Sequence, residues 1–139
     1  EELTGYQAGL IPEYDPTICS AKDNIFLVGD AALQVKATTG GGLVPGLLAA
    51  EACAEAIHDP TKQYQSLTKD IDKNLKAHLH MRNILDKFSD DDWNYLVKTF
   101  QEPKLNAILK THDRDQPLGM LLEMFIRKPS LVRFAKYIF

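Results

Sequence analysis

The distribution of glycine is the feature that most constrains how this chain can fold. Seven of its eight glycines precede Asp59-Pro60, and three of them form the run Gly40-Gly41-Gly42. This run lies between a short apolar segment, residues 24–28, and an alanine-rich stretch, residues 43–57. An apolar run, a glycine loop and a stretch of small residues with helical spacing predict a fully buried strand, a tight loop and a closely packed helix.

The sequence after Pro60 changes to charged and apolar residues spaced three to four positions apart. This periodicity predicts one long helix over residues 61–88. Ser89 and the three aspartates after it are typical of a helix N-cap with an acidic first turn. Three prolines are each typical of the first turn of a further short helix: Pro103, Pro117 and Pro129. The predicted fold class is therefore α+β, predominantly α.

Charge and cysteine content exclude several classes of function. The 16 basic and 19 acidic residues give a net charge of −3, which argues against nucleic acid as a partner. Cys19 and Cys53 show neither metal-ligand nor redox-motif spacing and are typical of reduced thiols in a cytoplasmic protein. The histidines and acidic pairs lie at no spacing typical of catalytic groups, so the sequence predicts no metal site and assigns no catalytic residue.

The segment Gly29-Asp30-Ala31-Ala32, followed ten residues later by the glycine run, carries the clearest chemical signal. An aspartate at the end of a strand can accept a hydrogen bond from a sugar hydroxyl, and a glycine run at a helix N-terminus favours an electron-rich oxygen. These residues predict a nucleotide-cofactor site that is neither a Walker A loop nor a GxGxxG fingerprint. The alternative is close packing of strand against helix with nothing bound.

Residues 24–32, the turn at residues 39–43 and the alanine-rich helix with Glu51 resemble the second flavin-binding motif of the geranylgeranyl reductase family of FAD-dependent oxidoreductases. Residues 5–12 are similar to the strand before that motif, and the similarity covers nearly the whole chain. It implies these cofactor-binding residues: Gly29, Asp30, Ala31, Thr39, Gly40, Gly41, Gly42 and Leu43. Asp30 is then expected to bond the ribitol, and the turn at residues 40–43 to lie near the pyrimidine edge of the flavin ring.

The same resemblance implies a C-terminal fragment of a p-hydroxybenzoate hydroxylase-like flavoprotein. Residues 1–60 are then the C-terminal portion of the FAD-binding domain, and residues 61–139 a helical C-terminal domain. The implied reaction of the full-length protein is reduction of isoprenoid (geranylgeranyl) C=C bonds in archaeal prenyl lipids. No GxGxxG segment occurs here. The N-terminal Rossmann half of the same protein is therefore the expected partner, and the fragment alone is expected to hold FAD weakly and to be inactive.

Two other interpretations remain open at this stage. One is a monooxygenase or halogenase of the same fold, since the Gly-Asp motif serves those enzymes as well. The other is a helical interaction module that keeps a degenerate flavin motif. Leu33 stands where many flavoproteins of this class have glycine, and Ala37 where they have proline. Both departures fit the second interpretation.

The remaining expectations concern the surface of the chain. Residues 118–139 hold four basic residues and one acidic residue among apolar ones, a pattern typical of peripheral contact with an anionic membrane or of packing against the rest of the protein. The predicted location is cytoplasmic, with peripheral membrane contact. The strand edge at residues 25–28 predicts that the isolated fragment dimerises.

Overall fold

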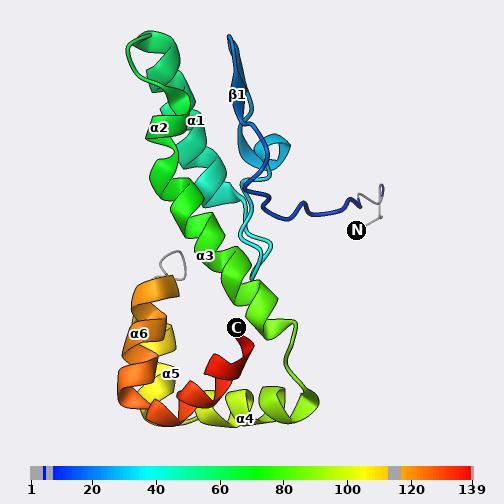
Figure 1. Ribbon diagram of the computed structural model, residues 1–139, viewed down its shortest axis with the longest axis vertical. Helices are drawn as coiled ribbons and strands as arrows, with labels where there is room; N and C mark the ends of the chain where they lie inside the picture. Colours follow the sequence, from blue (N-terminus) through cyan, green and yellow to red (C-terminus); the bar gives the residue numbers. More distant parts are fainter. Residues whose placement is uncertain (1–4, 6–7, 113–116, 139) are drawn as a thin grey trace. The chain divides into compact units, whose positions relative to one another are not determined.

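The computed structural model describes residues 5, 8–112 and 117–138. The chain divides into two compact units, Glu1–Leu75 and Lys76–Phe139 (Figure 1). This boundary lies within a helix, whereas the composition changes at Asp59-Pro60. The assignment of residues 1–60 to a FAD-binding domain and of residues 61–139 to a helical domain stays a prediction. The described residues are predominantly helical with one two-stranded sheet, which agrees with the predicted α+β class.

The sheet of the first unit is a small hairpin of β1 (Ala21–Lys22) and β2 (Ile25–Phe26), which pair antiparallel. The prediction of a fully buried strand over residues 24–28 is wrong, because Ile25 is 68% exposed. Within the described residues β2 pairs only with β1, so the other edge of β2 has no strand hydrogen-bonded to it. The described part of residues 5–12 also forms no strand.

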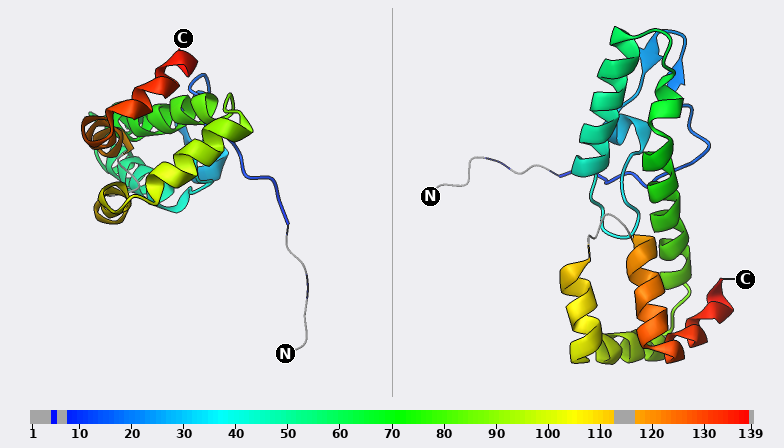
Figure 2. Two further views of the ribbon diagram at one scale, coloured as in Figure 1. Left: turned by 90° about the horizontal axis from the view of Figure 1, so that it is seen from below. Right: turned by 90° about the vertical axis from the view of Figure 1, so that its left-hand side faces the viewer.

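A short 3-10 helix, η1 (Gly29–Ala32), follows the hairpin and leads through the glycine loop into α1 (Leu43–His58). The predicted helix over residues 43–57 is therefore confirmed. Ala52 and Ala56 of α1 are buried against Tyr64 of α2 (Tyr64–Leu67). Small side chains permit this close approach, so α1 lies beside both η1 and α2 (Figure 2).

The predicted single helix over residues 61–88 is wrong in its bounds, because the structure has α2 followed by α3 (Lys69–Leu85). Asp59 accepts hydrogen bonds from the backbone N–H and the hydroxyl of Thr61, at 3.1 and 2.6 Å, which keeps this segment in a turn. Thr68 interrupts the helix with φ −86° and ψ 0°. The chain then leaves α3 early because Lys87 and Phe88 donate to carbonyls only three residues back.

The second unit contains α4 (Asp90–Phe100), α5 (Pro103–Thr111), α6 (Pro117–Arg127) and the 3-10 helix η2 (Pro129–Tyr137). Ser89 and Asp92 form a reciprocal capping box, so the predicted N-cap is confirmed. Each predicted proline begins an element, although the last element is a 3-10 helix. The core of this unit is made of large side chains: Leu105, Ile108, Met124, Leu131 and Phe134.

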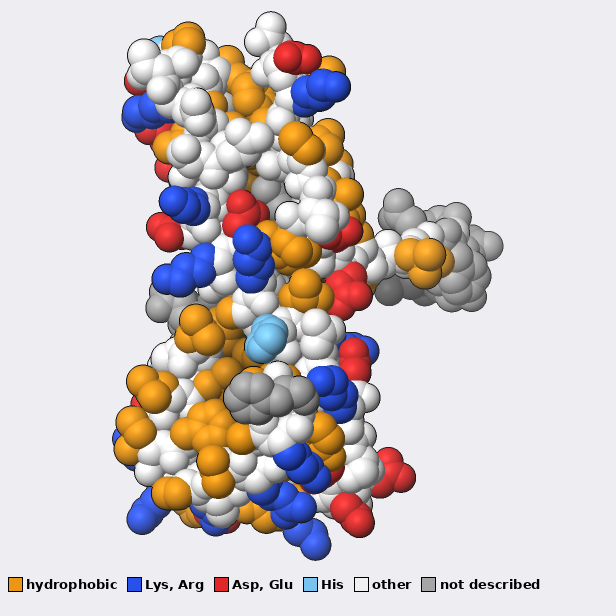
Figure 3. Space-filling model, viewed as in Figure 1, with side chains coloured by type: hydrophobic (Ala, Val, Ile, Leu, Met, Phe, Trp, Pro, Cys, Tyr) orange, Lys and Arg blue, Asp and Glu red, His pale blue; other side chains and the backbone are white. Residues whose placement is uncertain are grey.

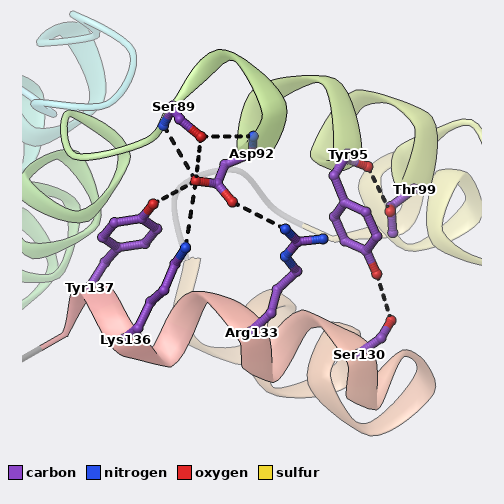
Figure 4. Close-up of polar contacts among 8 residues, drawn as sticks. All are labelled: Ser89, Asp92, Tyr95, Thr99, Ser130, Arg133, Lys136 and Tyr137. Atoms are coloured by element: carbon purple, nitrogen blue, oxygen red, sulfur yellow. Dashed lines mark hydrogen bonds and ion pairs between the residues drawn. The ribbon is translucent and has the colours of Figure 1, made fainter.

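A buried carboxylate joins the start of α4 to η2 (Figure 4). Asp92 is 2% exposed and accepts hydrogen bonds from the hydroxyls of Tyr137 and Ser89, at 2.5 and 2.8 Å. Arg133 and Lys136 approach the same carboxylate at 3.5 and 3.9 Å. The bond from Tyr137, followed by that from Ser89, lowers the pKa of Asp92 below its usual value. We call these five residues the Asp92 cluster.

Candidate cofactor site

The Gly29-Asp30 turn begins in the left-handed region of backbone conformation. Gly29 has φ +65°, which costs glycine little because it lacks a Cβ. Leu33, which closes η1, has φ 54° and ψ 29°, so a bulky residue also occupies the left-handed region. This position is one at which the sequence departs from the flavoprotein pattern, and the observed φ gives the physical reason why glycine suits it.

The loop at residues 36–42 folds back on itself and returns the glycine run to the turn. The N–H of Lys36 donates to the carbonyl of Gly41 at 3.1 Å, and the N–H of Gly40 donates to the carbonyl of Lys36 at 2.8 Å. A Cβ at Gly42 would lie 3.0 Å from Oδ1 of Asp30 and 3.2 Å from Cγ2 of Val35. The Asp30 carboxylate therefore lies directly against the backbone at the start of α1.

The turn, the loop and α1 border an open cavity of about 460 Å³. It is lined by Ile11, Gly29, Asp30, Gly40, Gly42, Leu43, Gly46 and Leu47. Five of the eight residues that the sequence implicates are in this lining, whereas Ala31, Thr39 and Gly41 are not. Sequence reasoning missed Ile11, Gly46 and Leu47. Gly46 follows Gly42 at one helical turn, and this spacing was the available signal.

The glycines contribute backbone surface more than hydrogen-bond donors. The N–H of Gly29 donates to Oε1 of Gln34 at 2.7 Å, and that of Gly41 donates to the hydroxyl of Thr39 at 3.3 Å. With the bond of Gly40 inside the loop, three of the expected donors are engaged within the protein. Among the residues that the structure describes, no side chain caps the N-terminus of α1, which opens next to the Asp30 carboxylate. The site thus offers a hydrogen-bond acceptor beside a helix N-terminus and a flat glycine wall.

A buried pair of polar side chains supports the turn from behind. Gln34 and Tyr64 are each 2% exposed, and Nε2 of Gln34 donates to the Tyr64 hydroxyl at 3.3 Å. That hydroxyl donates to the carbonyl of Leu27 at 2.8 Å. Burial raises the pKa of the Tyr64 hydroxyl, which keeps it protonated as a donor. Sequence analysis assigned neither residue to the site, because a buried glutamine carries no periodic signal and Tyr64 matches the apolar spacing of a helix.

Other features of the described residues do not point to a reaction centre. A larger cavity, of about 680 Å³, lies between the hairpin and the segment around Pro60, and none of the implicated residues lines it. Cys19 and Cys53 are free thiols. Within the described ranges, no group of histidine, cysteine or acidic side chains is placed to hold a metal ion. Over the same ranges, no helix has the length and apolarity to cross a membrane.

Comparison with known proteins gives a consistent group of relatives. The digeranylgeranylglycerophospholipid reductase 2 of Methanopyrus kandleri is 31% identical over an alignment of 141 residues, gaps included. The alignment covers 94% of this chain and 35% of that protein. The protein of the same name from Methanothermobacter thermautotrophicus is 31% identical over 142 residues, with the same coverage. The digeranylgeranylglycerophospholipid reductase of Methanocaldococcus jannaschii is 30% identical over 142 residues, covering 94% of this chain and 34% of that protein.

These relatives are much longer than the part of them that aligns. The chain spans about a third of the length of the curated relatives it matches. No family model matches the chain, and no solved structure matches it. The resemblance to the geranylgeranyl reductase family that the sequence motifs indicate is confirmed, since several reductases of this kind are similar to the chain over nearly all its length.

Proposed function

We propose that this chain is the C-terminal part of an FAD-dependent oxidoreductase that reduces isoprenoid C=C bonds in prenyl lipids. The observation that carries the proposal is the convergence of five implicated residues on one cavity from segments separated in sequence: Gly29, Asp30, Gly40, Gly42 and Leu43. The names of the similar reductases supply the substrate class. The residues present fit a flavin, because the cavity combines the Asp30 carboxylate with a lining in which four positions are glycine backbone.

Each residue then has a specific role in holding the cofactor. Asp30 accepts a hydrogen bond from a ribitol hydroxyl, and the turn at residues 40–43 lies along the pyrimidine edge of the ring. The N-terminus of α1 favours negative charge at that edge. Once reduced by an electron donor, bound flavin would supply the hydride for the substrate double bond, and a proton from solvent or a side chain would complete the saturation. The ADP half is held by a Rossmann segment elsewhere in the full-length protein, with residues 1–60 completing its domain and residues 61–139 forming the helical domain.

The second unit carries an apolar stripe suited to peripheral contact with a lipid surface. Leu118, Leu122 and Ile126 are 57%, 64% and 70% exposed and recur at helical spacing along α6. Hydrophobic side chains are visible on the surface of this unit (Figure 3). Arg127 and Lys128 follow directly in the chain and form ion pairs with Glu123 and Glu102, so the exposed apolar stripe is the feature that supports contact with a lipid surface.

Co-sedimentation of the full-length protein with anionic liposomes tests this contact. Leu122→Glu places a charge within the stripe and is expected to reduce the bound fraction several-fold. Val97→Glu, at an exposed apolar position on α4, is the matched control. Equal binding of the unsubstituted and Leu122→Glu proteins would remove the membrane contact from the proposal.

The cofactor is tested by the visible absorbance of the purified full-length protein and by titration of its apoprotein with FAD. Asp30→Ala removes one charged hydrogen-bond acceptor and is expected to weaken FAD binding about 10- to 100-fold. Asp70→Ala, at an exposed position on α3, is the matched control and leaves binding unchanged. A colourless unsubstituted protein that binds no FAD would overturn the proposal and favour the interaction module with a degenerate motif.

The reaction is tested by mass analysis of a prenyl lipid after incubation with the full-length protein and a reductant. Reduction adds two hydrogen atoms to each double bond that becomes saturated. A monooxygenase of the same fold would instead add one oxygen atom and would require dioxygen. Oxygen incorporation would therefore overturn the reductase while leaving the flavin site in place.

A further inference from the structure

We infer that Gln34 and Tyr64 act as positioning residues that fix the Gly29-Asp30 turn, and with it the Asp30 carboxylate, in the geometry that binds flavin. The inference rests on the proposed flavin site and extends it to two side chains that do not line the cavity. We call the two residues the Gln34–Tyr64 clamp.

Gln34 holds both polar backbone groups of Gly29. Its Oε1 accepts from the Gly29 N–H at 2.7 Å, and its own backbone N–H donates to the Gly29 carbonyl at 3.0 Å. Gly29 has φ +65° and tolerates many backbone conformations, so local sterics alone restrict it weakly. Two hydrogen bonds from one buried residue select a single conformation at the residue immediately before Asp30.

Tyr64 extends this restraint to the segment that enters the turn. The Gly29 N–H can only donate, so Oε1 of Gln34 faces it and Nε2 faces Tyr64. The Tyr64 hydroxyl accepts a hydrogen bond from Nε2 of Gln34 and donates one to the carbonyl of Leu27, two residues before Gly29. The ring of Tyr64 meets that of Phe26 edge-on, with centroids 5.5 Å apart. The clamp thus holds the chain on both sides of Val28 from the same buried point.

The position of Asp30 leaves little room for movement of the turn. Its Oδ1 lies where a Cβ at Gly42 would be only 3.0 Å away, and the Cα of Gly29 lies 3.5 Å from the place of a Cβ at Gly46. The turn therefore packs closely against α1 at positions where glycine leaves room for it, and a shift away from α1 withdraws the carboxylate from the cavity. Cofactor affinity is therefore expected to depend on the clamp even though neither clamp side chain contacts the cofactor.

The test is the dissociation constant of FAD for the apoprotein of the full-length protein, measured by titration in three variants. Gln34→Met keeps the side-chain volume, loses both side-chain bonds and is expected to weaken FAD binding about tenfold. Gln34→Glu keeps an oxygen that accepts from Gly29 in either protonation state and is expected to restore affinity to within about threefold. Tyr64→Phe, which removes only the hydroxyl, is expected to give an intermediate loss.

Two further measurements separate positioning from simple stabilisation. Gln101→Met, at an exposed glutamine after α4, is the matched control and leaves FAD binding unchanged. Hydrogen exchange of the peptide covering residues 28–33, measured without FAD, is expected to accelerate in Gln34→Met while peptides from the second unit are unaffected.

Each outcome bears on the inference. If Gln34→Met lowers the melting temperature but leaves FAD affinity unchanged, the clamp is only structural and the inference is overturned. If Gln34→Met does not fold, Tyr64→Phe decides, since unchanged affinity there also overturns it. If the unsubstituted protein binds no FAD, the proposed function fails first and the clamp fails with it.

Discussion

Each of the two units of this chain is stabilised internally by a different kind of interaction. A core cluster of the first unit packs two alanines of α1 against Tyr64, whereas the core cluster of the second packs five large apolar side chains with partly buried aromatic rings around them. In the first unit, buried polar side chains restrain the Gly29-Asp30 turn by hydrogen bonds to the backbone. In the second, the Asp92 cluster adds to a core that apolar burial already defines.

This difference follows from what each region has to expose. Glycine at positions 42 and 46 lets the Val35 side chain, the Asp30 carboxylate and the Gly29 backbone approach α1 closely. A unit made only of helices has no such restriction and can fill its interior with leucine, methionine and phenylalanine. Regions that present backbone to a ligand therefore depend on hydrogen bonds from polar side chains to keep their conformation. This contrast between the two units can be tested.

The largest expected effect comes from a cavity in the core of the second unit. Leu105 is 1% exposed, and Leu105→Ala is expected to lower the free energy of unfolding by about 2–5 kcal/mol. Ala52→Gly in α1 is the counterpart in the first unit, with an expected loss of about 1 kcal/mol. Urea unfolding followed by circular dichroism measures both losses, and the fluorescence of Trp93, the only tryptophan of the chain, reports on the second unit. Losses of equal size would contradict the contrast between the two cores.

The next effect is the pH dependence contributed by the Asp92 cluster. Because the folded pKa of Asp92 is lowered by Tyr137 first and by Ser89 second, its contribution is present above the unfolded pKa of about 4 and is lost as the pH falls through the folded value. Asp92→Asn is expected to lower the melting temperature at neutral pH and to flatten its fall in acid. Asp91→Asn, at an exposed neighbour, is the control for thermal unfolding across this range. An unchanged acid profile in Asp92→Asn would contradict this assignment.

A smaller effect concerns the left-handed residue in the first unit. Leu33→Gly removes the whole side chain, whereas Leu33→Ala keeps a Cβ on a residue with φ 54°. The glycine variant is therefore expected to be more stable than the alanine variant by about 1 kcal/mol, the reverse of the order in a helix. Chemical denaturation of both variants, followed by circular dichroism, measures the difference. Alanine as the more stable variant would show that residue 33 leaves this conformation freely.

The smallest effect on stability is expected at the hairpin. Ile25 is 68% exposed, so Ile25→Lys is expected to change the free energy of unfolding by no more than about 0.5 kcal/mol. It should nevertheless reduce self-association of the 139-residue chain, because a charge on an open strand edge opposes pairing. Sedimentation velocity measures the dimer fraction, and a dimer that persists in this variant would place the contact elsewhere.

Features specified by neighbouring residues could be predicted from the sequence. The alanine-rich helix, the Ser89 N-cap and the three prolines at element starts depend on contacts within about one helical turn, and all are confirmed. The long helix over residues 61–88 was predicted with the wrong bounds. Periodicity continues through Thr61 and Thr68, whereas neither the bonds of Thr61 to Asp59 nor the backbone angles of Thr68 alter the apolar pattern.

The sequence by itself determined the family resemblance, the predominantly helical class and the residues expected at the cofactor site, because these are written in local motifs. Only the tertiary structure decided that five of those residues line one cavity and that Gln34 and Tyr64 hold the turn from behind. The reason is distance along the chain: Gln34 and Tyr64 are 30 residues apart, and no local pattern encodes a hydrogen bond between them. The exposure of Ile25 was likewise decided by tertiary packing, because the described residues leave its side chain largely uncovered whatever its own hydrophobicity.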